Sequence, residues 1–223
     1  MTALPDATLP VVRAIPGPGS YMCGLGAGDG RLWHSDQEQL RIYALDPASG
    51  AVLHSVECRW VRADLTYHDR IVYQVGGRPK RLVMVEPTSG EIVGQRPVLP
   101  ASGRLTGVEV GPEGVWMCLR APTVVQLRDL PTMTVQREHE VPGLPSGLTC
   151  ADGVVVYADF EGGMVRAVDP GTGALLAAAF VEGHPTGLAW DGDLLWYCDF
   201  STRTVKAVRL AELLAAGAGR PTA

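Results

Sequence analysis

Two acidic residues stand where the pattern of the chain predicts small ones. Asp64 takes a position that is glycine at 24, 107, 147 and 187, and Glu109 takes one that is otherwise glycine, threonine or alanine. Two partly buried carboxylates could act as general acid and base, because burial raises one pKa toward neutrality. Arg62, Arg104 and Arg120 are expected in the same sector and could bind a carboxylate or phosphate. An ion-pair cluster, in which an arginine holds each carboxylate, is the alternative interpretation.

The pattern behind this comparison is a unit of about forty residues. It starts at Gly24, Gly107, Gly147 and Gly187, with a degenerate copy at Asp64, so successive copies are 40, 43, 40 and 40 residues apart. Each copy holds short apolar segments separated by turn residues such as Asp-Gly, which is typical of hairpins. A repeat of this length built from short strands predicts an all-β fold, a five-bladed β-propeller with four-stranded blades.

The repeat also predicts the domain organisation, a single domain with blades at about 18–58, 59–99, 100–142, 143–182 and 183–210. The fifth copy lacks a fourth strand, while residues 9–15 near the N-terminus resemble one. We therefore expect an N-terminal strand to close the last blade, which would remove an exposed sheet edge. Residues 211–223 are expected to form a short helix and a tail.

The composition narrows the class of partner. The net charge of the 223 residues is −5 and no basic tract occurs, so neither nucleic acid nor a membrane is indicated. The N-terminus lacks the features of a secretory signal. The five cysteines are odd in number and scattered, which is typical of reduced thiols. We expect a cytoplasmic protein with a small-molecule ligand, and the oligomeric state stays open.

Further candidate site residues lie in the predicted loops. His184 precedes the last inner strand and could serve as a general base. Phe160 and Phe200 share one repeat position and could form an apolar lip for substrate, or else cap the blade ends. Tyr73 is a further candidate for substrate binding, with packing between blades as the alternative. Arg78 and Lys80 are expected near the rim.

Three aspartates also share one repeat position: Asp36, Asp159 and Asp199. They could surround a divalent cation, the one cofactor that the sequence suggests. The alternative, which the repetition favours, is that each accepts hydrogen bonds from loop amides and stabilises the scaffold.

Several of these motifs resemble those of known propellers. A Pro-x-Gly-Leu segment followed by an apolar strand ending in aspartate stands at 145–159 and again at 185–199, which resembles NHL, YVTN and gluconolactonase-like propellers. With Asp-Pro-x-Thr-Gly-type turns and five copies, the chain is also similar to glutamine cyclotransferases. Their Glu-Gly-Trp-Gly-Leu-like segment is absent, and the chain has no asparagine for a gluconolactonase-like metal set. The resemblance implies the β-propeller fold.

The sequence leaves three functions open. The first is a cytoplasmic enzyme of the lyase, cyclase or hydrolase type that acts on a small anionic metabolite at the propeller axis, through the carboxylates and arginines above. The second is a non-catalytic propeller that binds a small molecule, and the third is a protein-interaction propeller. The off-pattern carboxylates, the arginines and the aromatic lip favour the first, and the absence of a recognisable catalytic set favours the other two. A continuous exposed apolar patch would point to the third.

Overall fold

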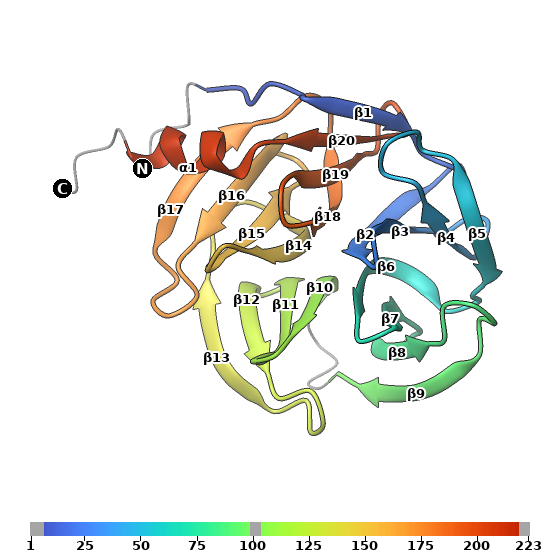
Figure 1. Ribbon diagram of the computed structural model, residues 1–223. Helices are drawn as coiled ribbons and strands as arrows, with labels where there is room; N and C mark the ends of the chain where they lie inside the picture. Colours follow the sequence, from blue (N-terminus) through green and yellow to red (C-terminus); the bar gives the residue numbers. More distant parts are fainter. Residues whose placement is uncertain (1–6, 99–103, 219–223) are drawn as a thin grey trace.

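The computed structural model of the protein describes residues 7–98 and 104–218 and contains five four-stranded antiparallel sheets. The sheets are arranged in a ring about a central axis, with the first strand of each blade innermost (Figure 1). This arrangement confirms the predicted five-bladed β-propeller.

The strands follow the chain order within each blade. Blade 1 contains β2 (Met22–Gly28), β3 (Arg31–Asp36), β4 (Arg41–Leu45) and β5 (Val52–Glu57). Blade 2 contains β6 (Val61–His68), β7 (Ile71–Gly76), β8 (Arg81–Val85) and β9 (Ile92–Pro97). Blade 3 contains β10 (Leu105–Gly111), β11 (Gly114–Arg120), β12 (Thr123–Arg128) and β13 (Val135–Glu140). Blade 4 contains β14 (Pro145–Ala151), β15 (Val154–Asp159), β16 (Met164–Val168) and β17 (Leu175–Phe180).

Blade 5 is completed by the N-terminal segment, as predicted. Its strands β18 (Pro185–Trp190), β19 (Leu195–Asp199) and β20 (Thr204–Val208) are joined by β1 (Arg13–Pro16), which pairs with β20. The closing strand begins later than the predicted residue 9, because the Leu9 N–H donates to the Phe180 carbonyl of blade 4 at 2.8 Å. The N-terminal segment therefore forms hydrogen bonds with both blade 4 and blade 5, and its strand completes the last blade of the ring.

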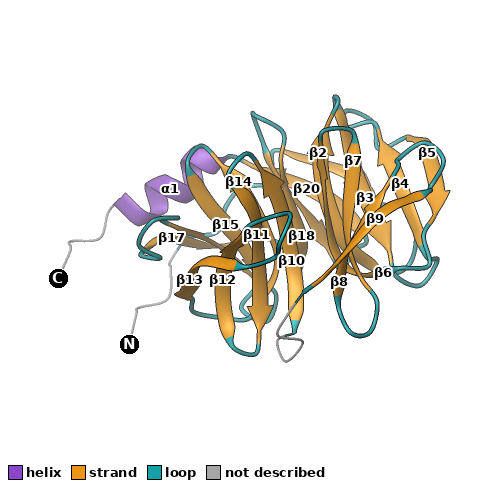
Figure 2. Ribbon diagram, turned by 90° about the horizontal axis from the view of Figure 1, so that it is seen from below, coloured by secondary structure: helices purple, strands orange, loops and turns teal. Residues whose placement is uncertain are grey.

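A short helix, α1 (Leu210–Ala218), follows the last strand and packs on β17 at the periphery of the ring (Figure 2). Leu210 and Leu213 are buried in the same apolar cluster as Ala177 and Ala179 of β17. Within residues 7–98 and 104–218, no helix combines the length and apolarity needed to cross a bilayer.

The inner strands pack so closely around the axis that four copies of the repeat need glycine there. A Cβ atom on Gly147 would lie 2.3 Å from the Thr186 carbonyl oxygen, and one on Gly187 would lie 2.5 Å from the Leu25 nitrogen. Both distances are far below van der Waals contact. Asp64 is the exception at this position, and its side chain occupies the centre of the ring.

The hairpin turns between the first and second strands explain the Asp-Gly pairs. Both central residues have positive φ, 52° at Asp29 and 68° at Gly30, as a type I′ turn requires. In blade 2 the same turn is Asp69-Arg70, with φ of 48° and 63°. A side chain at the second position is unfavourable in this left-handed conformation.

Arg70→Gly is therefore expected to raise the free energy of unfolding by about 1 kcal/mol, because glycine adopts this conformation without steric cost. Urea unfolding of the variant measures the change. Gly153→Ala in the equivalent turn of blade 4 is the matched control. It should lower stability by a similar amount, since φ is 82° there and no heavy atom lies within 4 Å of the added Cβ. A neutral result for both substitutions would contradict this account of the turns.

Candidate functional site: a cationic cavity on the propeller axis

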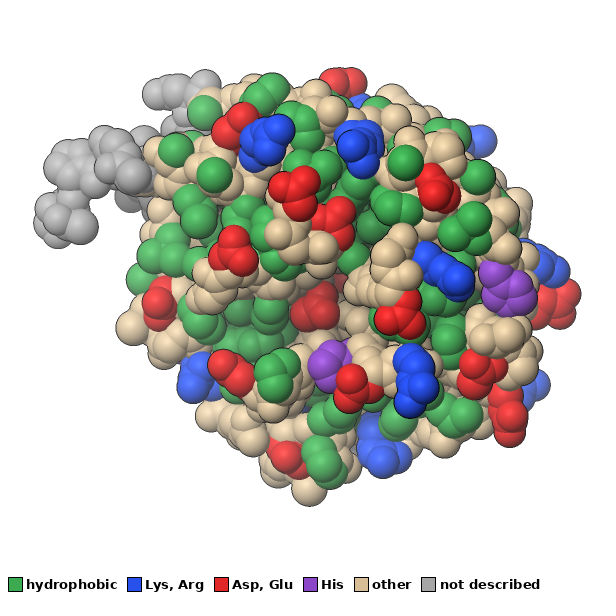
Figure 3. All heavy atoms as spheres, in the orientation of Figure 1, with side chains coloured by type: hydrophobic (Ala, Val, Ile, Leu, Met, Phe, Trp, Pro, Cys, Tyr) green, Lys and Arg blue, Asp and Glu red, His purple; other side chains and the backbone are tan. Residues whose placement is uncertain are grey.

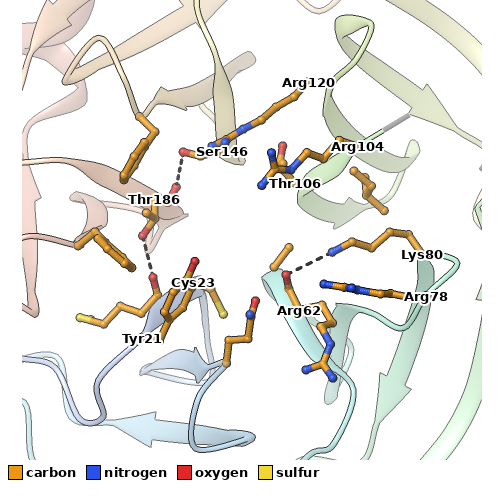
Figure 4. A pocket seen from close by; sticks show the side chains of 16 residues that line it. Tyr21, Cys23, Arg62, Arg78, Lys80, Arg104, Thr106, Arg120, Ser146 and Thr186 are labelled. Atoms are coloured by element: carbon orange, nitrogen blue, oxygen red, sulfur yellow. Dashed lines mark hydrogen bonds between the residues drawn. The ribbon is translucent and has the colours of Figure 1, made fainter. Parts of the chain in front are cut away.

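A cavity of about 530 Å³ opens at one end of the axis. All five inner strands contribute to its lining, and the five residues at one equivalent repeat position are Cys23, Ala63, Thr106, Ser146 and Thr186. Blades 1 to 5 follow one another clockwise in Figure 1 and anticlockwise in Figure 4, so the two figures view the propeller from opposite faces. The cavity seen in Figure 4 therefore lies on the face that is hidden in Figure 1. The loops between second and third strands and those leading into the inner strands surround its mouth.

One side of the cavity is formed by five basic residues, here called the cationic wall: Arg62, Arg78, Lys80, Arg104 and Arg120. They come from blades 2 and 3 and the segments leading into them. Figure 4 shows Arg78, Lys80 and Arg104 reaching toward the centre of the cavity. The three predicted arginines are thus brought together. Arg78 and Lys80, expected only near the rim, belong to the same wall.

No carboxylate of the described residues is in direct contact with the cationic wall. Within the described part of the chain, none of its five members forms an ion pair with a carboxylate. Arg62 Nη1 donates to the Val61 carbonyl at 2.7 Å, and Arg120 Nε donates to the Pro145 carbonyl at 2.9 Å. Burial, and then the charge of Arg104, lowers the pKa of Arg120. Such unpaired positive charge favours an anionic ligand.

The opposite side of the cavity carries three rings, here called the aromatic wall: Tyr21, Phe160 and Phe200. The ring centroid of Phe200 lies 5.0 Å from that of Tyr21 and 5.9 Å from that of Phe160, and both pairs are arranged edge to face. The Arg120 guanidinium lies 6.0 Å from the Phe160 ring and joins the two walls. The cavity therefore offers cations on one side and apolar surface on the other.

Three hydroxyl groups form most of the floor, and sequence reasoning missed them. Thr106 Oγ1 donates to the Pro145 carbonyl at 2.8 Å, and Ser146 Oγ donates to the Pro185 carbonyl at 3.1 Å. In the same way, Thr186 Oγ1 donates to the Met22 carbonyl of blade 1 at 3.3 Å. Each hydroxyl residue directly precedes the glycine of its repeat, so the alignment of copies already contained this signal. The fourth member, Cys23, is buried, which raises the pKa of its thiol to about 12 and keeps it protonated.

Asp64 lies one residue below the floor and is completely buried. Its carboxylate accepts backbone N–H groups from three other blades: Leu25 at 3.2 Å, Val108 at 3.3 Å and Leu148 at 3.3 Å. Burial raises the pKa of Asp64 well above its usual range, and these N–H groups oppose the rise. The predicted ion-pair cluster is wrong, because backbone amides take the place that an arginine was expected to fill.

Glu109 lies beyond Asp64, toward the other face of the ring. Its two carboxylate oxygens accept hydrogen bonds from the hydroxyls of Thr66 at 2.7 Å and Thr149 at 2.9 Å. Neither an arginine nor Asp64 shares these bonds. The face on this side is hollowed at its centre, and an acidic side chain lies in the hollow (Figure 3). Asp64 and Glu109 are thus both axial, as predicted, but neither lines the cavity that the arginines line.

Glu109→Gln is expected to remove a pH dependence of stability. Burial raises the pKa of Glu109 from 4.5 to about 7, although the two threonine hydroxyls oppose the rise. Because the folded state holds this proton more tightly than the unfolded state, the contribution to stability is complete below about pH 4.5 and is lost as pH rises through about 7.

The glutamine variant should therefore match the wild type at pH 4 and exceed it at pH 8, by about 3 kcal/mol. Urea unfolding of both proteins across this range measures the difference. A difference that stays constant with pH would contradict the assignment.

The remaining predicted residues lie at the edges of the site. His184 is exposed, and its ring lies 5.4 Å from that of Phe160, behind the aromatic wall. Its backbone N–H donates to Asp199 at 3.0 Å. Tyr73 is buried in the apolar cluster between blades 2 and 3, with Val75 among its members, as the packing alternative predicted. The proposed roles of His184 as a base and of Tyr73 in substrate binding stay predictions.

The three repeated aspartates are held by partners within their own blades or the segments leading into them. Asp36 accepts backbone N–H groups of Ser20 and Tyr21 at 2.6 Å each. Asp159 pairs with Arg166 at 2.8 Å, and Asp199 pairs with Lys206 at 2.9 Å. Among the described residues, no group of three or more His, Cys, Asp or Glu side chains is arranged to hold a metal ion. The scaffold interpretation of these aspartates agrees with this geometry.

Comparison with solved structures finds many propellers. Glutaminyl cyclase from Myxococcus xanthus matches with a TM-score of 0.77 and 15% identity, over 93% of this chain and 98% of that one. A streptogramin B lyase matches with a TM-score of 0.55 and 15% identity, over 87% and 67% of the two chains. A chain of the nidogen/laminin complex matches with a TM-score of 0.61 and 14% identity, over 86% and 76%.

The likeness shows the fold. At these identities, neighbours that include two enzymes and a protein–protein complex leave the activity of this chain open. The scaffold resemblance to cyclotransferase-type propellers, predicted from the turn motifs, is confirmed. Neither a protein-family model nor a curated protein sequence matches the chain.

Proposed function

We propose that this protein binds a small organic anion in the axial cavity, with its charged group on the cationic wall and an apolar group against the aromatic wall. The observation that supports this most is the concentration of charge. Five basic residues without carboxylate partners line one cavity of a protein whose net charge is −5. A purely structural role does not explain this cluster, because five like charges at one site repel one another and lower the stability of the fold unless an anion binds among them.

Catalysis on that anion, of lyase, cyclase or hydrolase type, is the second candidate. The likeness to glutaminyl cyclase over nearly the full length of both chains favours it. The predicted acid–base pair gives this candidate little support, because Asp64 and Glu109 do not reach the cavity lining. A catalytic group would have to come from the walls or the floor of the cavity.

Thermal unfolding in the presence of small anions tests the binding proposal. Phenyl phosphate, inorganic phosphate and phenol would be compared at constant ionic strength. At a hundred times its Kd, phenyl phosphate should stabilise the protein by about 2.7 kcal/mol and raise Tm by roughly 5–10 °C. Inorganic phosphate should shift Tm less at the same concentration, and phenol should not shift it. Equal shifts for phenyl phosphate and phenol would overturn the proposal.

A further inference from the structure

Lys80 differs from the rest of the cationic wall in its chemistry. The chain has 19 basic residues, and Lys80 and Lys206 are its only lysines. Arginine binds anions at least as well and is always charged, so an anion site alone does not call for a lysine. A lysine, in contrast, can lose its proton when buried and then act as a nucleophile.

The surroundings of the two lysines are opposite. Lys206 Nζ lies 2.8 Å from Glu182 and 2.9 Å from Asp199, in two ion pairs. Although burial lowers its pKa, the hydrogen bonds and charges of these carboxylates raise it overall. Lys80 Nζ has a neutral partner, the Arg62 carbonyl at 3.2 Å, and it points into the cavity (Figure 4).

Three arginines and one cysteine face Lys80 from the neighbouring elements; the arginines favour its neutral amine, and Cys23 opposes it. Arg62 in β6, Arg78 in its own loop and Arg104 ahead of β10 are all positive, and Cys23 in β2 is a protonated thiol. Burial first, and then the charges of these arginines, lowers the pKa of Lys80 to about 8. A considerable fraction of this side chain is therefore a free amine at mildly alkaline pH, beside groups that can hold an anion.

We propose that Lys80 forms an imine with a small oxo acid, whose carboxylate is held by Arg78 and Arg104 while its carbonyl carbon faces Nζ. This inference rests on the proposed function, because the anionic group must first bind in the cavity. It names the ligand class as molecules that combine an acid group with an aldehyde or ketone.

The reaction is a condensation that releases water. The Nζ lone pair attacks the carbonyl carbon, and the π electron pair of the C=O bond moves to oxygen, which gains a proton as nitrogen loses one. The resulting carbinolamine then loses its hydroxyl group with a second proton from nitrogen, as water, while the C=N bond forms. The guanidinium groups beside Lys80 can stabilise the negative charge that develops on the carbonyl oxygen. No oxidant or metal is needed.

Reductive trapping tests the inference on the full chain. The protein would be incubated with glyoxylate and sodium cyanoborohydride at pH 8, digested, and analysed by mass spectrometry for carboxymethyl groups. The two other amines are internal references: Lys206, which is ion-paired, and the α-amino group; α-amino groups of model peptides have a pKa near 8. Lys80 should be labelled at least about tenfold faster than either, because the arginines bring the oxo acid to it.

Three controls separate specific from general reactivity. Phenyl phosphate should protect Lys80 and leave the α-amino group unprotected. Acetaldehyde, which has no carboxylate, should show no preference for Lys80. Lys80→Arg keeps a cation at this position but should lose all labelling in the cavity, and its thermal shift with phenyl phosphate reports whether the cavity is intact.

The outcomes distinguish the two proposals. If phenyl phosphate stabilises the wild type but Lys80 is labelled no faster than the α-amino group, the imine proposal is wrong and anion binding stands. If phenyl phosphate neither stabilises the protein nor protects Lys80, the proposed function is wrong as well.

Discussion

Replacing Asp64 with alanine is expected to lower the free energy of unfolding by about 3–5 kcal/mol, since buried donors that lose their acceptor each cost about 1–3 kcal/mol. Its carboxylate accepts N–H groups of Leu25, Val108 and Leu148, which belong to blades 1, 3 and 4. Together with β6, which carries Asp64, one side chain thus joins four of the five inner strands. The expected loss holds for either protonation state, because a protonated carboxyl still accepts hydrogen bonds.

Asp64→Gly makes this test sharper. Glycine is the residue of the other four copies, so a requirement for small residues around the axis would make this variant neutral or stabilising. The hydrogen bonds predict instead a loss as large as that of alanine. Urea unfolding measures both variants, and Asp193→Ala, at an exposed turn, is the control for loss of a carboxylate. Either axial variant within about 1 kcal/mol of the wild type would contradict the role assigned to Asp64.

Arg104→Glu is expected to weaken the binding of phenyl phosphate about a hundredfold or more. A hydrogen bond to a charged group contributes about 1.5–3 kcal/mol, and a like charge in its place adds repulsion of about 1 kcal/mol. Arg104 is exposed at the mouth, so the substitution should leave folding intact. Calorimetric titration at fixed ionic strength measures the change in Kd.

Arg31→Glu is the matched control for that change. Arg31 is also exposed, but it lines a hollow on the opposite face, with Asp29 and Gly30. The same change in net charge there should alter Kd less than about twofold, because salt screens charges beyond about 10 Å. Equal effects of the two substitutions would mean that the anion binds through the overall field of the protein and not in the cavity.

Much of the fold could be predicted from the sequence because its decisive features are local and repeated. The Asp29-Gly30 and Asp152-Gly153 turns have positive φ at both central residues, and an acidic residue followed by glycine also stands at the corresponding turn of the third and fifth copies, so strands and blade number follow. The closing strand followed from a missing partner in the fifth copy. Its exact start did not, because the bond from Leu9 to Phe180 joins residues that are far apart in sequence.

The site could be predicted only in part. Alignment of the copies shows that a residue lies near the axis, but it does not show how far along the axis, from one face of the ring to the other, the residue lies. Glu109 lies three residues past Thr106, and at about 3.3 Å per residue this is roughly 10 Å further along the strand. That distance separates the cavity floor from the far side of Asp64. Arg62, Arg104 and Arg120 lie together as expected, because they stand near strand ends or in loops, where the end of the blade defines the position along the axis.

A crystal structure with phenyl phosphate would test the central claim most directly. The account predicts one molecule in the axial cavity, with its phosphate oxygens within hydrogen-bond distance of Lys80 and Arg104 and its ring against Phe200. Phenyl phosphate bound only outside this cavity, or a cavity that stays unoccupied at saturating concentration, would contradict the claim that the cationic and aromatic walls form a binding site for a small organic anion.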